Sequence, residues 1–304
     1  MDKFKILKNV KNIYIEKPVT ADIFLTSRCN NDCTWCTYKR WDIKNRHDMT
    51  FESFKKYTDR LISLGVKGLI LTGGGEPTIN KDFGKITRYL EDNNIPYGIN
   101  TNFNNYVECN PRFLKVSLDG YDRKSYKKIR EVDKYDDVVE NIKKYASYKT
   151  NTKLGIQTVV TNKEQVKLFY ENNKNLDVDY IAFRPVEKTQ GNYYKKEEVN
   201  EIFDEFKKIN DKRILVNYKW EMLNEIFDEC YANWSQLAIN ENGDVMYCCH
   251  KPYEIVGHIL DADILEKKKN FKTNISMCDV PCRLTSSNII CRYISEDSNT
   301  SMFL

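Results

Sequence analysis

The most informative stretch of the chain is ADIFLTSRCNNDCTWC, which covers residues 21–36. An apolar run typical of a strand buried on both faces leads there into three cysteines spaced Cys-x3-Cys-x2-Cys. Three thiolates on one loop can hold three irons of a 4Fe–4S cluster and leave the fourth iron open. A structural zinc site needs four N or S ligands, and the nearest histidine, His47, lies eleven residues past Cys36. The spacing therefore favours iron–sulfur over zinc at Cys29, Cys33 and Cys36.

This apolar run is the first of a series of strand-like segments that alternate with helical patterns. The segments lack polar alternation and cover residues 21–26, 68–72, 97–101, 113–119, 154–161 and 180–185. Between them, apolar residues at helical spacing predict helices after the N-cap Thr50 and around Ile86, Ile142 and Val166. Such alternation predicts an α/β fold with a parallel sheet, either open or curled into part of a barrel.

The pattern changes near residue 187. Residues 195–208 and 220–229 are predicted to be helices, and residues 237–240 and 245–248 to be a hairpin around the turn Asn242-Gly243. The Lys267-Lys268-Lys269 run is expected to be the solvated face of a helix. We therefore predict a βα domain over residues 1–210 and a small cysteine-rich α+β domain, built on the β-hairpin, over residues 211–304.

The composition is that of a globular cytoplasmic protein. The 304 residues include ten cysteines, 48 Lys and Arg, and 44 Asp and Glu, for a formal net charge of +4. No apolar run is long enough for a membrane helix, and the N-terminus lacks the apolar core of a signal peptide. In the reducing cytoplasm, clustered cysteines are metal ligands more often than disulfides. The mild, interspersed charge gives no indication of nucleic-acid binding.

Two further motifs stand at predicted strand ends. Thr72-Gly73-Gly74-Gly75-Glu76-Pro77 follows the second strand; its glycines permit close approach of a ligand, and Glu76 offers an acceptor to an ammonium group. Ser117-Leu118-Asp119 ends the fourth strand. Together with the cysteine loop, these motifs have the order and approximate spacing found in the radical SAM superfamily, which the chain resembles from about residue 20 to about residue 190.

The resemblance implies a partial (β/α)6 TIM-like barrel with a 4Fe–4S cluster at its C-terminal mouth. Cys29, Cys33 and Cys36 would ligate this cluster, whose open iron takes the amino and carboxylate groups of S-adenosyl-L-methionine (SAM). Cleavage of SAM would give methionine and a 5′-deoxyadenosyl radical, with a flavodoxin- or ferredoxin-type protein as electron donor. The residues implied in cofactor binding are Gly74, Gly75 and Glu76 for the methionine amino end, Ser117 for the ribose, Trp35 for the adenine, Arg130 for the carboxylate, and Asp119 at the mouth. A surface arginine is the alternative interpretation of Arg130.

Five of the remaining cysteines form a C-terminal set. Cys230 and Cys248 bracket the predicted hairpin in a Cys-x12-Gly-x4-Cys element, which resembles the opening of the auxiliary-cluster domains called SPASM and Twitch. The small number of cysteines favours the Twitch form, with one auxiliary 4Fe–4S cluster. The ligands implied are Cys230, Cys248 and Cys278, completed by either Cys282 or Cys291. Buried thiols or a zinc site are the alternatives.

Cys249 follows an expected ligand, so its thiol would point away from the auxiliary cluster while staying near the cavity. It would then donate a hydrogen atom to a substrate radical; the alternative is a buried small apolar residue. No role is expected for Cys109, and structural roles are expected for His250 and His258.

The substrate is expected to be small and polar, of the aminosugar, aminocyclitol or polyol type. Only about twenty residues precede the first strand, which disfavours an N-terminal peptide-recognition or cobalamin-binding domain. Arg184 and Glu187 are candidate substrate contacts or else a surface ion pair. Epimerisation with Cys249 as hydrogen donor is favoured. The alternatives are oxidation of an alcohol with the auxiliary cluster as electron acceptor, modification of a ribosomal peptide, and a non-catalytic metal-binding module.

Overall fold

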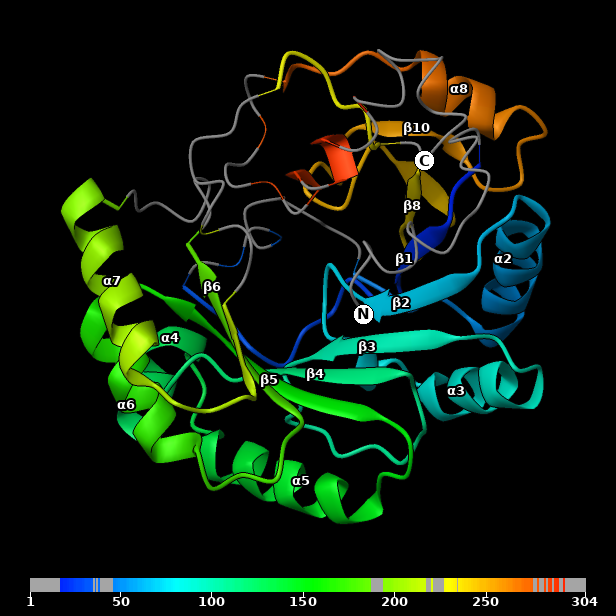
Figure 1. The fold of residues 1–304 in the computed structure, drawn as a ribbon. Coiled ribbons are helices and arrows are strands. Elements are labelled where there is room, and N and C mark those ends of the chain that lie inside the picture. The colour runs from blue at the N-terminus through cyan, green and yellow to red at the C-terminus, as the bar shows by residue number, and fades with distance from the viewer. Residues whose placement is uncertain are drawn as a thin grey trace.

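The computed structural model describes residues 17–186 except 35, 37 and 39–45, residues 194–216, residue 220, and residues 227–292 except 234, 276, 277, 279–281, 283, 286, 290 and 291. Within these residues the chain forms one curved, ten-stranded sheet with helices along its outer face (Figure 1). The α/β fold with a mostly parallel sheet is as predicted.

Most strands follow one another across the sheet in chain order. They are β1 (Thr20–Phe24), β2 (Gly68–Thr72), β3 (Tyr97–Thr101), β4 (Phe113–Ser117), β5 (Lys153–Val160), β6 (Tyr180–Pro185) and β7 (Ile214–Val216), each parallel to its neighbours. On the other side of β1 lie β8 (Gln236–Ile239), β9 (Asp244–Met246) and β10 (Ile255–His258). The predicted bounds of β2, β3 and β6 are confirmed without change, because buried parallel strands are continuous apolar runs.

The helices are α2 (Phe51–Ser63), the 3₁₀ turn η2 (Pro77–Ile79), α3 (Phe83–Asp92), α4 (Arg123–Arg130), α5 (Tyr135–Tyr148), α6 (Lys163–Asn173), α7 (Lys196–Lys208) and α8 (Ile264–Asn270). Thr50 caps α2 as predicted, since its hydroxyl accepts a hydrogen bond from Ser53 N at 3.2 Å. The sequence analysis missed α4, whose residues RKSYKKIR are nearly all polar. Most of the helix predicted at 220–229 lies outside the described residues, and residues 227–229 are not helical.

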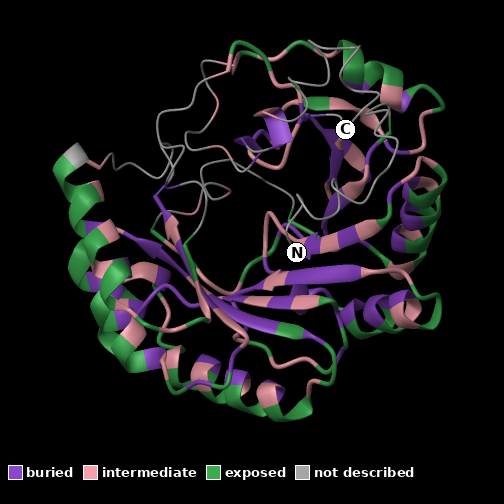
Figure 2. Cartoon of the chain, in the orientation of Figure 1, coloured by how far each residue is buried: buried purple, intermediate pink, exposed green. Residues whose placement is uncertain are grey.

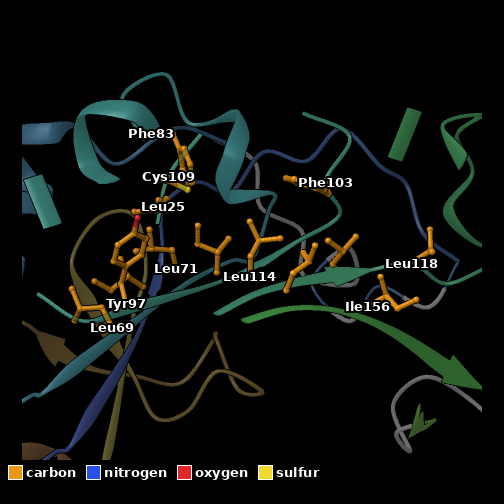
Figure 3. Packing of buried hydrophobic residues seen from close by; sticks show 14 of the residues in the cluster. Leu25, Leu69, Leu71, Phe83, Tyr97, Phe103, Cys109, Leu114, Leu118 and Ile156 are labelled. Carbon is orange, nitrogen blue, oxygen red and sulfur yellow. The ribbon is translucent and has the colours of Figure 1, made fainter. Parts of the chain in front are cut away.

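The main core lies between the sheet and its outer helices. Each helix buries one face, so buried and exposed residues alternate along it, whereas most strand residues are buried or half-buried (Figure 2). The short strand β7 is the main exception, since Leu215 and Val216 are exposed. Leu69, Leu71 and Leu114 of the sheet belong to this core (Figure 3). Cys109 lies in the same cluster and is 2% exposed. Its side chain is thus part of the core, and the absence of a chemical role stays a prediction.

The hairpin β8–β9 extends the barrel sheet. Its first strand pairs in parallel with β1, in a register that sets Thr20 opposite Gln236 and Ile23 opposite Ile239. Gly243 forms the turn at a φ of +86°, a value that favours glycine. The C-terminal segment therefore shares one sheet with the βα units. The turn after β8 lies at the same sheet edge as the cysteine loop, whereas Cys248, after the antiparallel strand β9, lies toward the opposite edge.

One prediction about this segment is wrong. The Lys267-Lys268-Lys269 run lies on α8, but Lys268 is 0% exposed, whereas Lys267 and Lys269 are solvated. Helix α8 packs on β10 (Figure 1), and Lys268 stands on its inner face. None of the described helices is both long and apolar enough to cross a bilayer.

Candidate functional site

The first three cysteines lie on the loop after β1, at the carboxyl end of the parallel strands. Two backbone hydrogen bonds fasten this loop to the end of α4: Asp32 N donates to Arg130 O at 3.2 Å, and Thr34 N to Ile129 O at 3.0 Å. Within the loop, Cys36 N donates to Cys33 O at 3.2 Å. The cysteine loop is thus held in place by a helix that lies about ninety residues further along the chain.

The glycine motif packs against this loop. Gly75 N donates to Thr26 O at 3.0 Å, and Glu76 N to Arg28 O at 2.8 Å. A Cβ atom on Gly75 would lie 1.8 Å from the Arg28 carbonyl oxygen, and one on Gly74 would lie 1.8 Å from the Tyr38 ring. The glycines are therefore required for the loops after β1 and β2 to meet. Their contact with a cofactor stays a prediction.

Glu76 links the ends of β2 and β3. Its side chain is buried, and one carboxylate oxygen accepts hydrogen bonds from Thr78 N at 3.1 Å, Thr78 Oγ1 at 2.7 Å and Thr101 Oγ1 at 2.5 Å. The other oxygen accepts from Asn102 N at 2.7 Å. Burial raises the pKa of Glu76, and these donors oppose the rise. Its predicted contact with an ammonium group would share oxygens that these four donors already occupy.

Arg130 lies buried between the carboxyl end of β4 and the cysteine loop. Its Nη2 lies 2.8 Å from Asp119 Oδ2 and also contacts Ser117 O, while Nη1 donates to Cys33 Sγ at 3.3 Å. The Nε atom is buried and has no hydrogen-bond partner among the described residues. Asp119 accepts a second hydrogen bond, from Val159 N at 2.8 Å. The alternative of a surface arginine is therefore wrong, because Arg130 is only 8% exposed.

The thiols suit a cluster better than a single ion. Burial raises the pKa of Cys29 to about 12 and raises that of Cys33, and the three thiols act electrostatically on one another. Across the described part of the chain, no three His, Cys, Asp or Glu side chains are close enough to hold one metal ion. A tetrahedral zinc ion would draw its thiolates to about 3.8 Å from each other. A 4Fe–4S cluster instead binds each thiolate at a different iron, which fits this donor set.

The second cysteine set also comes together. Burial raises the pKa of Cys230 to about 11, and the charges of Cys282 and Cys278 add to the rise. The pKa of Cys248 is likewise raised, by burial first and then by Cys249, Cys282 and Cys230. Four of the five candidate ligands therefore lie close together. The fifth, Cys291, lies outside the described residues, as do Trp35 and Glu187.

Cys249 lies on the inner side of the sheet. It packs, partly buried, against a small cluster formed by Phe24 of β1, Ala238 of β8 and Met246 of β9. Tyr38, from the cysteine loop, packs against the same cluster. The role of Cys249 as a hydrogen donor stays a prediction.

Some residues at the site were not singled out from the sequence. Asn102 Nδ2 donates to Asn30 Oδ1 at 2.7 Å and lies 4.0 Å from Cys29 Sγ, and Asn104 Nδ2 donates to Asn31 Oδ1 at 2.5 Å. Their position directly after β3, at the carboxyl end of a parallel strand, is the signal that could have identified them. His258, expected to be structural, donates from Nε2 to Asn242 O at 3.0 Å and packs edge-on against Tyr57.

Comparisons with known proteins bear on this geometry. Residues 23–167 match the profile of the Radical SAM superfamily. The chain is 30% identical over 245 residues to Uncharacterized protein MJ0907 of Methanocaldococcus jannaschii, a match that covers 74% of this chain and 82% of that protein. It is also 35% identical over 136 residues to the Probable GTP 3′,8-cyclase of Pyrococcus horikoshii. That match covers 42% of this chain and 43% of the cyclase, less than half its length.

The fold has counterparts among solved structures. Streptococcus suis SuiB bound to its precursor peptide SuiA superposes with a TM-score of 0.64 at 16% identity, over 85% of this chain and 68% of SuiB. SuiB bound to S-adenosylmethionine gives a TM-score of 0.59 at 16% identity, over 81% of this chain and 63% of SuiB. At this identity the likeness concerns the fold alone. The sequence match identifies residues 23–167 as a Radical SAM domain.

Proposed function

We propose that this protein is an enzyme that binds SAM and a 4Fe–4S cluster at the cysteine loop and cleaves SAM reductively. The observation that carries the proposal is the loop itself. Its three thiols are fastened by α4 on one side and by the glycine motif on the other, and Arg130 donates to one of them at 3.3 Å. When bound, the cluster and SAM supply a 5′-deoxyadenosyl radical, and the protein orients the reactants and excludes water.

The unpaired donors at this site suit an anionic group. Within the described residues, Arg130 Nε and Asn31 Nδ2 are both buried without a hydrogen-bond partner. Both residues stand beside the cysteine loop, where the resemblance to the superfamily puts the carboxylate of SAM. A buried donor that lacks a partner costs about 1–3 kcal/mol, which a ligand acceptor would offset. We therefore retain Arg130 as a contact for the carboxylate, with Asp119 as the residue that holds it.

The C-terminal segment is proposed to hold one auxiliary 4Fe–4S cluster, in the manner of a Twitch domain. Cys230, Cys248, Cys278 and Cys282 lie close together, and within the described residues they are not arranged around a single ion. Cys282 belongs to this group, and Cys291, which lies outside the described residues, stays the alternative fourth ligand. We further propose a cytoplasmic location and a flavodoxin- or ferredoxin-type electron donor.

The favoured reaction is epimerisation of a small polar substrate. A substrate carbon loses a hydrogen atom to the radical, and the S–H bond of Cys249 breaks to return a hydrogen atom from the opposite face. The resulting thiyl radical takes one electron and one proton to restore the thiol. The electron donor supplies both electrons: one cleaves SAM, and the other reduces the thiyl radical of Cys249. Support comes from the packing of Cys249 against the same cluster of Phe24, Ala238 and Met246 that Tyr38 of the cysteine loop contacts.

Two other outcomes are retained because specific observations favour them. Oxidation of an alcohol, with loss of the second electron to the auxiliary cluster, is favoured by the cysteine grouping in the C-terminal segment. Modification of a peptide is favoured by the fold shared with SuiB, which has been solved with its precursor peptide bound. Both begin with the same hydrogen abstraction.

The deciding experiment is turnover in deuterated water with anaerobically reconstituted protein, SAM and a reductant, against a panel of polyols, aminosugars and peptides. Epimerisation predicts an isomeric product with one deuterium at a stable carbon. Oxidation predicts an unlabelled product two mass units lighter than the substrate. A peptide as the sole substrate would replace the small-molecule assignment.

A further inference from the structure

Two lysines are buried in the C-terminal segment, beside the second cysteine set. Lys268 is 0% and Lys251 is 2% exposed. Their ammonium groups lie 5.8 Å and 5.9 Å from the centroid of the Tyr247 ring, and Tyr247 directly precedes Cys248. Two cations are thus held near the backbone that carries an expected cluster ligand.

The two lysines differ in how their charge is balanced. Lys251 Nζ lies 3.2 Å from Glu254 Oε1 and also donates to Thr273 Oγ1 at 2.5 Å and Asn274 O at 2.7 Å. It therefore has a carboxylate of its own. Lys268 Nζ donates instead to two backbone carbonyls, those of Met246 at 3.1 Å and Tyr247 at 2.7 Å, which are neutral acceptors.

Cys248 directly follows Tyr247, whose carbonyl oxygen accepts a hydrogen bond from Lys268 Nζ at 2.7 Å. Cys230, Cys249 and the buried carboxylate of Asp22 also interact electrostatically with Lys268. Burial of an ammonium group costs several kcal/mol unless an anion offsets it. Neutral thiols do not offset it, whereas a cluster with four thiolate ligands is a net anion and gains a further negative charge on reduction. Lys268 is therefore balanced when the cluster is present.

We propose that Lys268 is the counter-cation of the auxiliary cluster and raises its reduction potential. This inference rests on the auxiliary cluster proposed above. A nearby positive charge stabilises the more negative, reduced form of a cluster, so it favours electron uptake. Lys268 would then set how readily the auxiliary cluster accepts an electron, which is the property that an oxidation requires.

The test isolates the auxiliary cluster in the full-length chain. Replacement of Cys29, Cys33 and Cys36 by Ala removes the first cluster, and iron, sulfide and an EPR-monitored redox titration then report on the second. In this background Lys268→Met should make the midpoint potential more negative. Lys269→Met is the matched control, because Lys269 is the next residue of the same helix and is exposed; it should leave the potential unchanged. Lys268→Arg, which keeps the charge, should leave it near that of the parent.

The outcomes distinguish the counter-cation role of Lys268 from the existence of the auxiliary cluster. An unchanged or more positive potential in a cluster-loaded Lys268→Met chain would overturn the counter-cation role. A parent triple variant that binds no iron would instead refute the auxiliary cluster itself. If the Lys268→Met chain fails to bind the cluster, the counter-cation role is tested by comparing the melting temperatures of the metal-free Lys268→Met and Lys269→Met chains. A higher value than for Lys269→Met supports the role, because the uncompensated cation is gone; an equal or lower value overturns it.

Discussion

Arg130 Nη1 lies 3.3 Å from Cys33 Sγ, so a buried guanidinium at the end of α4 contacts one of the three thiols of the cysteine loop. Burial raises the pKa of Cys33, and the charge of Arg130 and its hydrogen bond act against that rise. The thiolate is the form that binds metal. Asp119, 2.8 Å away on the other side of Arg130, keeps the guanidinium in position.

Arg130→Met should destabilise the metal-free protein by about 3–5 kcal/mol, because it leaves the Asp119 carboxylate buried without its partner. Asp119→Asn in the same chain should recover part of this loss, as the buried charge is then gone. Arg123→Met is the matched control: its ion pair with Asp133 is exposed on the same helix and is worth roughly 0–1 kcal/mol. Urea denaturation measures all three. Equal losses of unfolding free energy in Arg130→Met and Arg123→Met would contradict the stabilising role of the buried Arg130–Asp119 pair.

Gly75→Ala should displace the glycine motif from the cysteine loop and reduce cluster binding. The new Cβ would lie 1.8 Å from the Arg28 carbonyl oxygen, a backbone atom that cannot turn aside. Gly84→Ala is the control, since a Cβ on Gly84 in α3 would meet no described atom within 4 Å, and alanine there should stabilise the helix by roughly 0.5–1 kcal/mol. Iron content after reconstitution and urea denaturation provide the comparison. Full iron content in Gly75→Ala would show that the loops can separate without loss.

Asp211→Asn should change the acid stability of the protein. Hydrogen bonds from Arg213, at 2.7 Å from Nη2, lower the pKa of Asp211 from 3.8 to about 2. A lowered carboxyl pKa gives stability that is present above 3.8 and is lost as the pH falls through about 2. The difference in unfolding free energy between wild type and Asp211→Asn should therefore be constant above about pH 5 and shrink toward about pH 2. A difference independent of pH would refute the ion pair's contribution.

Cys249→Ala should abolish epimer formation while SAM cleavage and iron content stay at wild-type levels. The reason is that only the returned hydrogen atom is missing, whereas both cysteine sets are intact. Cys109→Ala is the control thiol, because Cys109 lies in the main core and away from the carboxyl ends of the strands. Product analysis in deuterated water measures the effect. Epimer formation that persists in Cys249→Ala would eliminate it as the hydrogen donor.

The strands could be predicted because each is a continuous apolar run, and the hairpin because Asn242-Gly243 favours a tight turn. These are local signals. The pairing of β8 with β1 joins residues more than two hundred positions apart, and nothing in either strand alone specifies its neighbour. Helix α4 was missed because its stability comes from a capping box at Asp122 and Ser125 and from packing, not from an apolar pattern.

At the site, the sequence identified the ligand-bearing loops but not the contacts among them. Spacing grouped Cys29, Cys33 and Cys36, and the glycine motif marked the adjoining loop. Two of the four donors to Glu76, Thr101 Oγ1 and Asn102 N, come from the end of β3, so these contacts were not predictable from the motif. Lys268 lies in a lysine run whose pattern favours solvent, and only the packing of α8 against β10 reveals that it is buried.

Reductive cleavage of SAM tests the central claim most directly. Protein reconstituted anaerobically with iron and sulfide, then supplied with SAM and dithionite, should release 5′-deoxyadenosine and methionine. Cys33→Ala, which removes the thiol that Arg130 contacts, should reduce that release to the level of a protein-free control. Wild-type protein that binds iron and SAM yet forms no 5′-deoxyadenosine would contradict the proposed chemistry.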